Sequence, residues 1–324
     1  QRPPGATPVD RVGRVTTPQS GPATDAGAQP DAFTLSYAGF QPVEEGLRET
    51  LTSTGNGYLG TRGAAEWEES DGVHYPGTYI HGLYNRATTM LGGIPVHNED
   101  LVNLPNWLPL KLRICGAEVL RLAELELLDY HHELDLRTAL LTRRLRFRDK
   151  EGRETALVSR RFVSMTSMHH AYLEWTLTPL NWSGEAEVVT ALDGRVVNGG
   201  VPRYRQLESD HLRPGSTMVP EPAVLALKSV TRQSEVIVGV AARTLVRVDG
   251  REVDVPRSDF GTTDYVQQTL HLDLERGVPV TIEKAVSMFT SRDPATGDTI
   301  VRAHRSVARS RSFEAAYDHH SASW

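Results

Sequence analysis

Between Leu110 and Met288 the sequence breaks into short stretches in which apolar residues alternate with polar ones, and turn residues separate the stretches. This feature constrains the fold most, because successive side chains of a strand point to opposite faces of a sheet. Many such stretches in sequence are typical of two packed antiparallel sheets and not of a parallel sheet. The chain is therefore predicted to be mainly β, as an antiparallel sandwich.

The clearest example is a predicted hairpin. Four alternate residues, Leu141, Arg143, Leu145 and Phe147, precede an Asp-Lys-Glu-Gly turn, and an apolar, β-branched run follows the turn. Two antiparallel strands are the natural interpretation. Predicted strands also cover residues 156–163, 171–177, 186–191, 224–230, 236–241, 245–248, 266–274 and 278–287.

The pattern changes to a helical one after residue 293. Asp298 is placed to cap a helix over residues 299–308, in which apolar residues recur on one face, and a second helical stretch covers residues 312–324. Helical sequence that stops at the last residue, without a capping glycine, indicates that a larger helical region follows. The start at Gln1 likewise indicates a chain cut from something longer.

Residues 1–30 have a different composition from the rest. They are rich in proline, glycine, threonine and alanine and contain no aromatic residue that could anchor a core. We therefore expect a linker or disordered tail over residues 1–30, a β-sandwich domain over residues 31–291 and a helical linker over residues 292–324.

Composition excludes several classes of partner. The net charge is −6, and 35 basic residues are interspersed with 41 acidic ones, so no basic stripe is present for nucleic acid. No run of eighteen apolar residues exists that could span a membrane. The single cysteine, Cys115, is interpreted as a small apolar residue in a strand, and its isolation favours a reducing, cytoplasmic setting.

The segment Gly-Asn-Gly-Tyr-Leu-Gly at residues 55–60 matches the G-x-G-x-x-G pattern of dinucleotide sites. That chemistry needs a preceding strand and a following helix, and neither is indicated here. No Gly-Lys-Ser/Thr is present either, so a phosphate loop is excluded. Glycines this dense fit a loop that packs closely against another element or against a sugar.

Other charged and titratable clusters are interpreted as structural. A solvated loop is predicted for the acidic residues Glu66, Glu68, Glu69 and Asp71. The sequence shows no apolar surroundings that would raise the pKa of one carboxyl group above that of another. The His-His pairs place neighbouring rings on different faces, which suits metal chelation poorly, so we expect no metal. For Trp107, stacking on a sugar ring and burial in the core remain equal alternatives.

Four segments in this order carry a specific resemblance: residues 49–51 (Glu-Thr-Leu), 55–63 (Gly-Asn-Gly-Tyr-Leu-Gly-Thr-Arg-Gly), 77–79 (Gly-Thr-Tyr) and 101–107 (Leu-Val-Asn-Leu-Pro-Asn-Trp). Together they resemble the opening of glycoside hydrolase family 65, which contains the maltose, kojibiose and trehalose phosphorylases and their hydrolytic relatives. The resemblance extends over about residues 33–324.

The resemblance implies a supersandwich of the galactose mutarotase type, followed by linker helices and then an (α/α)6 barrel outside this chain. In the family, a glutamic acid of that barrel protonates the leaving oxygen while phosphate attacks with inversion. The implied enzyme takes an α-linked glucose disaccharide, needs no cofactor beyond phosphate as substrate, and is a cytoplasmic homodimer. No catalytic residue is assigned within this chain. A family 65 hydrolase and an independent carbohydrate-binding or dimerisation module remain alternatives.

Three segments, residues 55–63, 79–85 and 98–107, combine glycine, asparagine and aromatic residues in a mixture that suits loops facing a polar ligand. We expect them to lie close together on the side of the sandwich that would face the barrel. The alternative is that their glycines form tight turns and their aromatics are buried. The candidate substrate-proximal residues are Asn56, Tyr58, Arg62, Tyr79, His81, Asn85, Asn103, Asn106 and Trp107.

Overall fold

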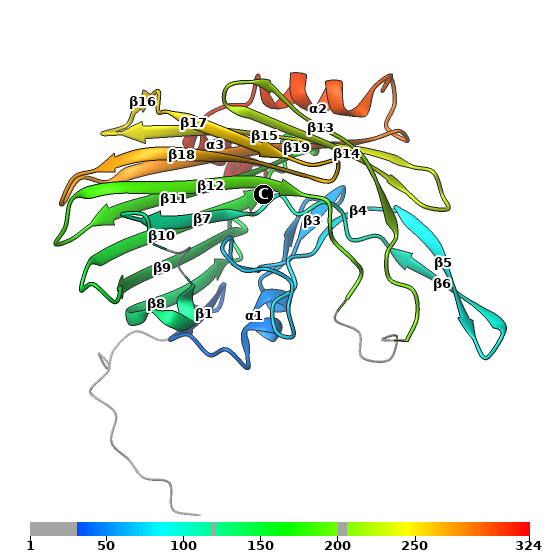
Figure 1. Ribbon diagram of the computed structural model, residues 1–324, viewed down its shortest axis with the longest axis horizontal. Coiled ribbons are helices and arrows are strands. Elements are labelled where there is room, and N and C mark those ends of the chain that lie inside the picture. Colours follow the sequence, from blue (N-terminus) through cyan, green and yellow to red (C-terminus); the bar gives the residue numbers. More distant parts are fainter. Residues whose placement is uncertain (1–30, 118–120, 200–205) are drawn as a thin grey trace, which may run out of the picture. The chain divides into compact units, whose positions relative to one another are not determined.

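The structure is a computed structural model that describes residues 31–117, 121–199 and 206–324. The tail predicted over residues 1–30 lies outside the described residues. Residues Phe33–Trp324 form one compact unit. Its main features are a large and a small antiparallel sheet that face one another (Figure 1).

The large sheet has the strand order β1-β8-β9-β10-β11-β19-β15-β14-β13, and β16 also pairs with β15. Its strands are β1 (Thr34–Ala38), β8 (Glu126–Asp135), β9 (Leu140–Arg148), β10 (Glu154–Val163), β11 (His170–Pro179), β13 (Leu212–Glu221), β14 (Val224–Thr231), β15 (Ile237–Val248), β16 (Arg251–Val253) and β19 (Val280–Thr290). A short 3-10 turn, η1 (Leu122–Glu124), precedes β8.

The small sheet has the order β17-β18-β12-β7. Its strands are β7 (Leu110–Ile114), β12 (Gly184–Asp193), β17 (Arg257–Gly261) and β18 (Tyr265–Leu274). Among the described residues, every strand pair in both sheets is antiparallel. This confirms the predicted antiparallel sandwich, and the described strands contain no parallel unit for a dinucleotide fold.

The predicted hairpin is present as β9 and β10. Leu145 pairs with Leu157 across the hairpin, and both side chains are buried in the core. The Asp149 carboxylate accepts hydrogen bonds from the backbone N–H groups of Glu151 and Arg153, which closes the turn. The local sequence therefore determines both the strands and their connection.

The expected break between two strands at residues 242–244 is wrong, because β15 runs without interruption from Ile237 to Val248. The polar side chains in the supposed gap have partners on both faces of the sheet. The Arg243 guanidinium donates to the carbonyl oxygens of Ala308 and Ser310, at 3.1 and 2.7 Å. Thr244 hydrogen-bonds Thr190 of the facing sheet.

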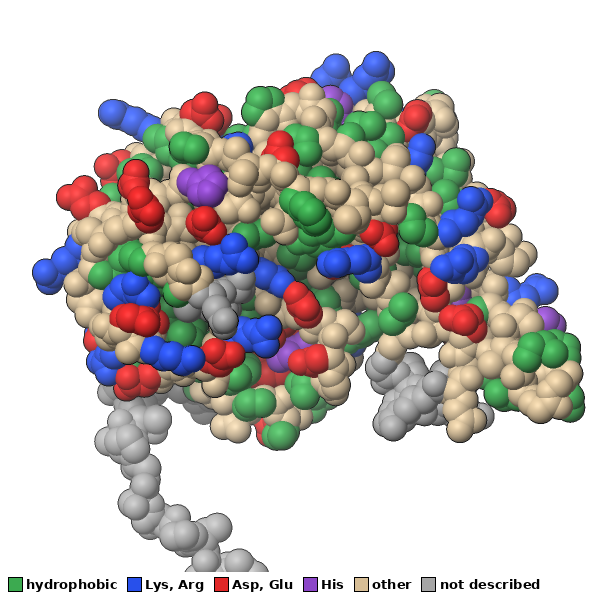
Figure 2. Space-filling model, in the orientation of Figure 1, with side chains coloured by type: hydrophobic (Ala, Val, Ile, Leu, Met, Phe, Trp, Pro, Cys, Tyr) green, Lys and Arg blue, Asp and Glu red, His purple; other side chains and the backbone are tan. Residues whose placement is uncertain are grey.

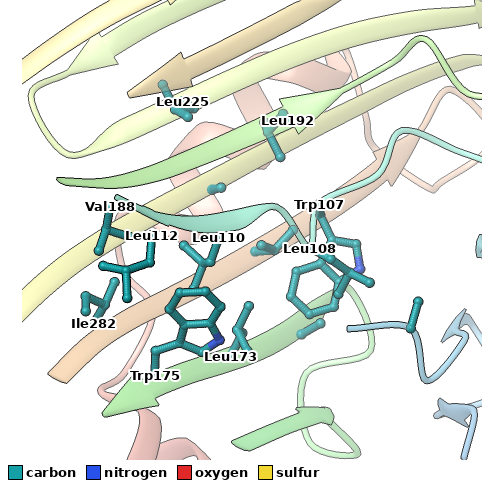
Figure 3. Close-up of a cluster of buried hydrophobic side chains, with 14 of the residues drawn as sticks. Trp107, Leu108, Leu110, Leu112, Leu173, Trp175, Val188, Leu192, Leu225 and Ile282 are labelled. Carbon is teal, nitrogen blue, oxygen red and sulfur yellow. The ribbon is translucent and has the colours of Figure 1, made fainter. Parts of the chain in front are cut away.

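The main core fills the space between the two sheets. Figure 3 shows Leu110 and Leu112 of β7 pointing toward Leu173 and Trp175 of β11, with side chains of β12, β14 and β19 around them. All of these side chains are buried. Removal of this apolar surface from water is the main driving force for bringing the sheets together.

Two helices cover the outer face of the large sheet, as Figure 1 shows for α2 (Thr299–Val307) and α3 (Phe313–Ser323). The Asp298 carboxylate accepts from the Ile300 N–H and caps α2, as predicted. A second buried cluster, which includes Phe162, Tyr172, Phe289 and Phe313, lies between helices and sheet. Gly239 of β15 permits the close approach, because a Cβ there would lie 2.4 Å from the Thr299 carbonyl carbon.

Residues 41–109, which we call the rim, form small elements outside the two sheets. They comprise α1 (Glu45–Leu51), the three-stranded sheet of β2 (Thr54–Gly55), β3 (Leu59–Thr61) and β4 (Thr78–Ile80), and the hairpin of β5 (Tyr84–Leu91) and β6 (Ile94–Leu101). The hairpin projects away from the sheets in Figure 1.

The expectation that residues 55–63, 79–85 and 98–107 are loops is wrong in part, since each contains strand residues, such as Gly60, Tyr79 and Asn98. Gly92 and Gly93 both have positive φ and form the two-residue hairpin turn between β5 and β6. Cys115 is a further correction. It follows β7 instead of belonging to it, has φ of 51°, and is exposed at a turn with Gly116.

Candidate functional site

Asn56 is the central residue of the turn between β2 and β3. Its side-chain oxygen accepts from the backbone N–H groups of Tyr58 and Leu59, at 3.0 and 2.9 Å. Its amide nitrogen donates to the carbonyl oxygens of Ser164 and Met168. All of these are protein contacts, so Asn56 holds the glycine-rich turn against the end of β10.

Tyr58 and Arg62, on either side of β3, also have protein partners. The Tyr58 hydroxyl donates to Asp293 at 2.7 Å, and burial together with that bond raises the pKa of Tyr58. Arg62 donates to the carbonyl oxygens of Tyr75 and Gly46, at 2.9 and 3.1 Å. Its guanidinium also lies 5.4 Å from the centre of the Tyr75 ring. Tyr58 therefore attaches the rim to the segment that follows β19, and Arg62 joins two segments of the rim.

The structure does bring the three predicted segments together. Tyr79 pairs with Gly60 across β3 and β4, and its hydroxyl donates to that of Tyr75 at 3.3 Å. The Asn103 side chain then joins the third segment, because its oxygen accepts from the Thr78 N–H at 3.0 Å. The predicted proximity of the segments is therefore observed, and it arises from a small sheet.

Three candidates lie elsewhere. His81 is exposed, and its ring has no hydrogen-bond partner among the residues that the structure describes. Asn85 is buried at the base of the hairpin, where it bonds His211 and accepts from the backbone of Gln233 and Ser234. The Trp107 side chain is 0% exposed within the main core. Burial in the core is therefore the correct alternative for Trp107, and stacking on a sugar is excluded in this structure.

The predicted solvated acidic loop is wrong for Glu66, which is 1% exposed. Its carboxylate lies 3.0 Å from the Arg161 guanidinium and 3.8 Å from that of Arg143, and it accepts from the Trp175 indole N–H at 3.3 Å. Arg161 also donates to the carbonyl oxygen of Ala64. Burial lowers the pKa of Arg161 to about 10. This buried ionic cluster attaches the rim to the large sheet.

A second charged group surrounds His74. Its Nδ1 lies 2.7 Å from Glu49, and its Nε2 lies 3.7 Å from Glu68. Burial alone would lower the pKa of His74, but the hydrogen bond to Glu49 and the charge of Glu68 raise it above the usual value. Burial raises the pKa of Glu68. The contacts of His74 with Glu49 and Glu68 therefore hold in place the segment that leads into Tyr75.

A surface cleft of about 470 Å³ opens beside these residues. Its lining comes from residues 68–76 and 103–109 of the rim, from the ends of β7, β12 and β18, and from the segment after β12. Among the nine candidates from the sequence, only Asn103 and Asn106 line it. The lining residues are Glu68, Glu69, Ser70, Tyr75, Pro76, Asn103, Asn106, Pro109, Lys111, Asp193, Arg195, Val196, Val197 and Tyr265.

The two tyrosines of the cleft are held in place. The Arg195 guanidinium lies 4.2 Å from the centre of the Tyr265 ring. The Tyr75 hydroxyl donates to the Val197 carbonyl oxygen at 3.3 Å and accepts from the Gly199 N–H at 3.1 Å. These contacts restrict rotation of both rings, so the aromatic walls of the cleft are preformed.

Charges in the cleft nearly balance. Arg195 forms a two-pronged ion pair with Asp193, with both N–O distances 2.8 Å, and Lys111 pairs with Glu69. Glu68 is the remaining acid and contacts His74. Figure 2 shows the same mixing of acidic and basic side chains over the visible face of the molecule. The cleft therefore has no strong field of one sign.

Sequence reasoning missed Asp193, Arg195 and Tyr265 as cleft residues. Asp193 ends β12, Arg195 follows it and Tyr265 begins β18, and no local pattern links them to residues 103–109. The link is a pair of backbone hydrogen bonds between Asn106 and Asp193, at 2.7 and 2.9 Å, which forms an isolated antiparallel bridge. The one sign of this part of the cleft in the sequence is that Asp193, Gly194 and Arg195 interrupt an apolar run.

Within residues 31–117, 121–199 and 206–324, no group of three or more His, Cys, Asp or Glu side chains is arranged to hold a metal ion. In that same part of the chain, no helix has the length and apolar character needed to cross a bilayer.

These features define a mainly antiparallel β-sandwich protein with a polar, aromatic-walled cleft. Residues 35–324 match the N-terminal domain of glycosyl hydrolase family 65. The chain therefore belongs to this family and carries its N-terminal domain.

The relatives to which the chain is similar support this family assignment. The chain is 40% identical over 294 residues to a Mycobacterium tuberculosis protein named only as a glycosyl hydrolase, a match over 91% of this chain and 22% of that protein. It is 30% identical to a kojibiose phosphorylase of Caldanaerobacter subterraneus and to a trehalose 6-phosphate phosphorylase of Lactococcus lactis. Each of these matches covers 76% of this chain and 31% of the relative.

A solved structure of a human-microbiome protein assigned as a kojibiose phosphorylase has the same fold. Its TM-score is 0.76 at 19% identity, over 91% of this chain and 38% of that one. The chain thus spans between about a fifth and a third of the length of the curated relatives described above.

Proposed function

We propose that this chain is the non-catalytic N-terminal domain of an inverting α-glucoside phosphorylase. Such an enzyme cleaves a glucose disaccharide with phosphate to give β-glucose 1-phosphate and glucose. The observation that carries the proposal is the 30% identity to two phosphorylases, of which the chain matches only 31%. The catalytic barrel would then belong to the remaining part of the polypeptide.

The cleft chemistry supports a non-catalytic role. Inverting cleavage needs a carboxylic acid that can protonate the leaving oxygen and an open position for the nucleophile. Asp193 and Glu69 are each paired with a cation, and Glu68 contacts His74. Among the described cleft residues, each carboxylate thus has a partner that stabilises a fixed charge or position.

The first test is phosphate-dependent release of glucose 1-phosphate from kojibiose, trehalose, nigerose and maltose. We expect none from the 324-residue chain and release from a polypeptide that also contains the barrel. The coding sequence downstream of Trp324 should encode that barrel. Turnover by the 324-residue chain alone would overturn the assignment of catalysis to another part.

A family 65 hydrolase is the second candidate, because the relative at 40% identity is named only as a glycosyl hydrolase. Release of glucose without phosphate by the barrel-containing polypeptide would favour this alternative. A gene that ends at residue 324 would instead favour an independent carbohydrate-binding or dimerisation module. We also propose a cytoplasmic homodimer, on the basis of the family resemblance.

A further inference from the structure

Asn106 presents an unusual polar group to the cleft. The residue is only 6% exposed, and its side-chain oxygen accepts from the Leu108 N–H at 3.0 Å. Its amide nitrogen has no hydrogen-bond partner among the residues that the structure describes, although the residue lines the cleft. The nitrogen itself is accessible from the cleft, so it can donate to water or to a ligand that displaces that water.

We propose that this cleft binds a neutral sugar unit of an α-glucoside, with the Asn106 amide nitrogen donating to a sugar oxygen. The volume of about 470 Å³ lies within the range of small-molecule sites, which run from roughly 300 to 1,000 Å³. Such sites combine apolar and aromatic walls with a few fixed polar groups. Tyr75, Tyr265 and the carboxylates of Glu68 and Asp193 supply that combination.

The backbone around Asn106 makes the donor rigid. Its N–H and C=O groups form the bridge to Asp193, and Pro105 and Pro109 restrict the chain on both sides. The Asn106 side chain is further held by Leu108. The free amide nitrogen is therefore presented in one position, which reduces the entropy lost on binding.

Charge favours a neutral ligand over a phosphorylated one. Both cations of the cleft, Lys111 and Arg195, already pair with Glu69 and Asp193. Glu68 adds a further negative charge, so a phosphate group would meet more carboxylates than free cations. Sugar hydroxyls, in contrast, can donate to the carboxylates and accept from Asn106.

The choice of α-glucosides as ligands rests on the proposed function, but the cleft and its free donor do not. The test is a calorimetric titration of the 324-residue chain, without phosphate, with glucose, kojibiose, trehalose and trehalose 6-phosphate. We expect saturable binding of at least one neutral sugar, and at least tenfold weaker binding of trehalose 6-phosphate than of trehalose.

The decisive variant is Asn106→Asp, which keeps the acceptor for Leu108 and replaces the donor by a negatively charged carboxylate oxygen. We expect at least a tenfold loss of affinity. Asn181→Asp is the control for the added charge, because Asn181 also accepts from a backbone N–H, at 2.7 Å from Glu154, and does not line the cleft, although its amide nitrogen donates to the Gly152 carbonyl oxygen. Tyr265→Leu, which leaves Asn106 intact, is the second variant if Asn106→Asp does not fold.

The inference is overturned if the folded chain binds none of these sugars, or if both cleft variants bind like the wild type. Its failure is distinguishable from that of the proposed function. Sugar binding by this chain together with no phosphorolysis by the barrel-containing polypeptide would refute the function alone. Phosphorolysis without binding by the folded chain would refute the cleft alone.

Discussion

The sandwich and the rim are stabilised by different means. In the sandwich, long strands pair in regular register and bury apolar side chains between the sheets. In the rim, short elements also bury apolar side chains in that core, such as Trp107, but buried polar groups add to their attachment, such as Glu66 with Arg161. The comparison shows that local alternation of apolar and polar residues determines the sandwich. Specific polar contacts between residues far apart in the sequence help to position the rim, which carries the cleft.

The largest effect is expected for Glu66→Gln. This change leaves the buried Arg161 and Arg143 without their counter-charge, and breaking a buried ion pair costs about 4 kcal/mol. The free energy of unfolding, measured by urea titration, should fall accordingly. Glu69→Gln is the control, because Glu69 is exposed. Equal effects of the two changes would show that the ionic cluster does not hold the rim.

In the sandwich, Leu173→Ala should lower the free energy of unfolding by about 3 kcal/mol, through lost burial and a new cavity. Leu173 is fully buried in β11. Leu47→Ala, at an exposed position of α1, should have little effect and serves as the control. If the two variants unfold at the same urea concentration, packing is not what stabilises the sandwich.

His132 gives a pH-dependent test at the junction of the two regions. Its ring is fully buried, and neither nitrogen has a hydrogen-bond partner in the part of the chain that the structure describes. Burial together with the charges of Arg143 and Arg161 strongly lowers its pKa. Below the unfolded pKa of 6.5, only the unfolded state takes up this proton. The free energy of unfolding should therefore fall with falling pH by up to about 1.4 kcal/mol per pH unit.

His132→Leu removes this proton uptake. We expect the variant to be more stable than the wild type at pH 5, with a difference that shrinks toward pH 8. Melting temperatures over this range measure the effect. A pH-independent difference would mean that His132 is protonated in the folded state as well.

The smallest effect is expected for His74→Gln in the rim. Because the folded pKa of His74 is raised, its ion pair with Glu49 stabilises the protein fully below pH 6.5 and less as pH rises through the folded pKa. The variant should lose about 1 kcal/mol at pH 5.5 and less at pH 9. His97→Gln, at an exposed position, is the control. A larger loss at pH 9 than at pH 5.5 would contradict the assigned direction.

The same contrast explains what the sequence could predict. The hairpin of β9 and β10 and the cap of α2 depend on neighbours in the chain, and both were predicted. The burial of Glu66 was not, because its partners Arg161 and Trp175 come from distant strands. Proximity of the glycine-rich segments was predicted from composition, but the cleft also requires Asp193 and Tyr265, which no local pattern connects to Asn106.

The contact at Gly239 bears on how this protein can be shortened. Because α2 lies directly against β15 at that glycine, the two terminal helices shield the apolar outer surface around Phe162 and Phe289. A fragment ended near Ser291 would uncover that surface, and large exposed apolar patches promote aggregation. We expect soluble fragments of this domain to require α2 and α3, even though their sequence looks like a connector.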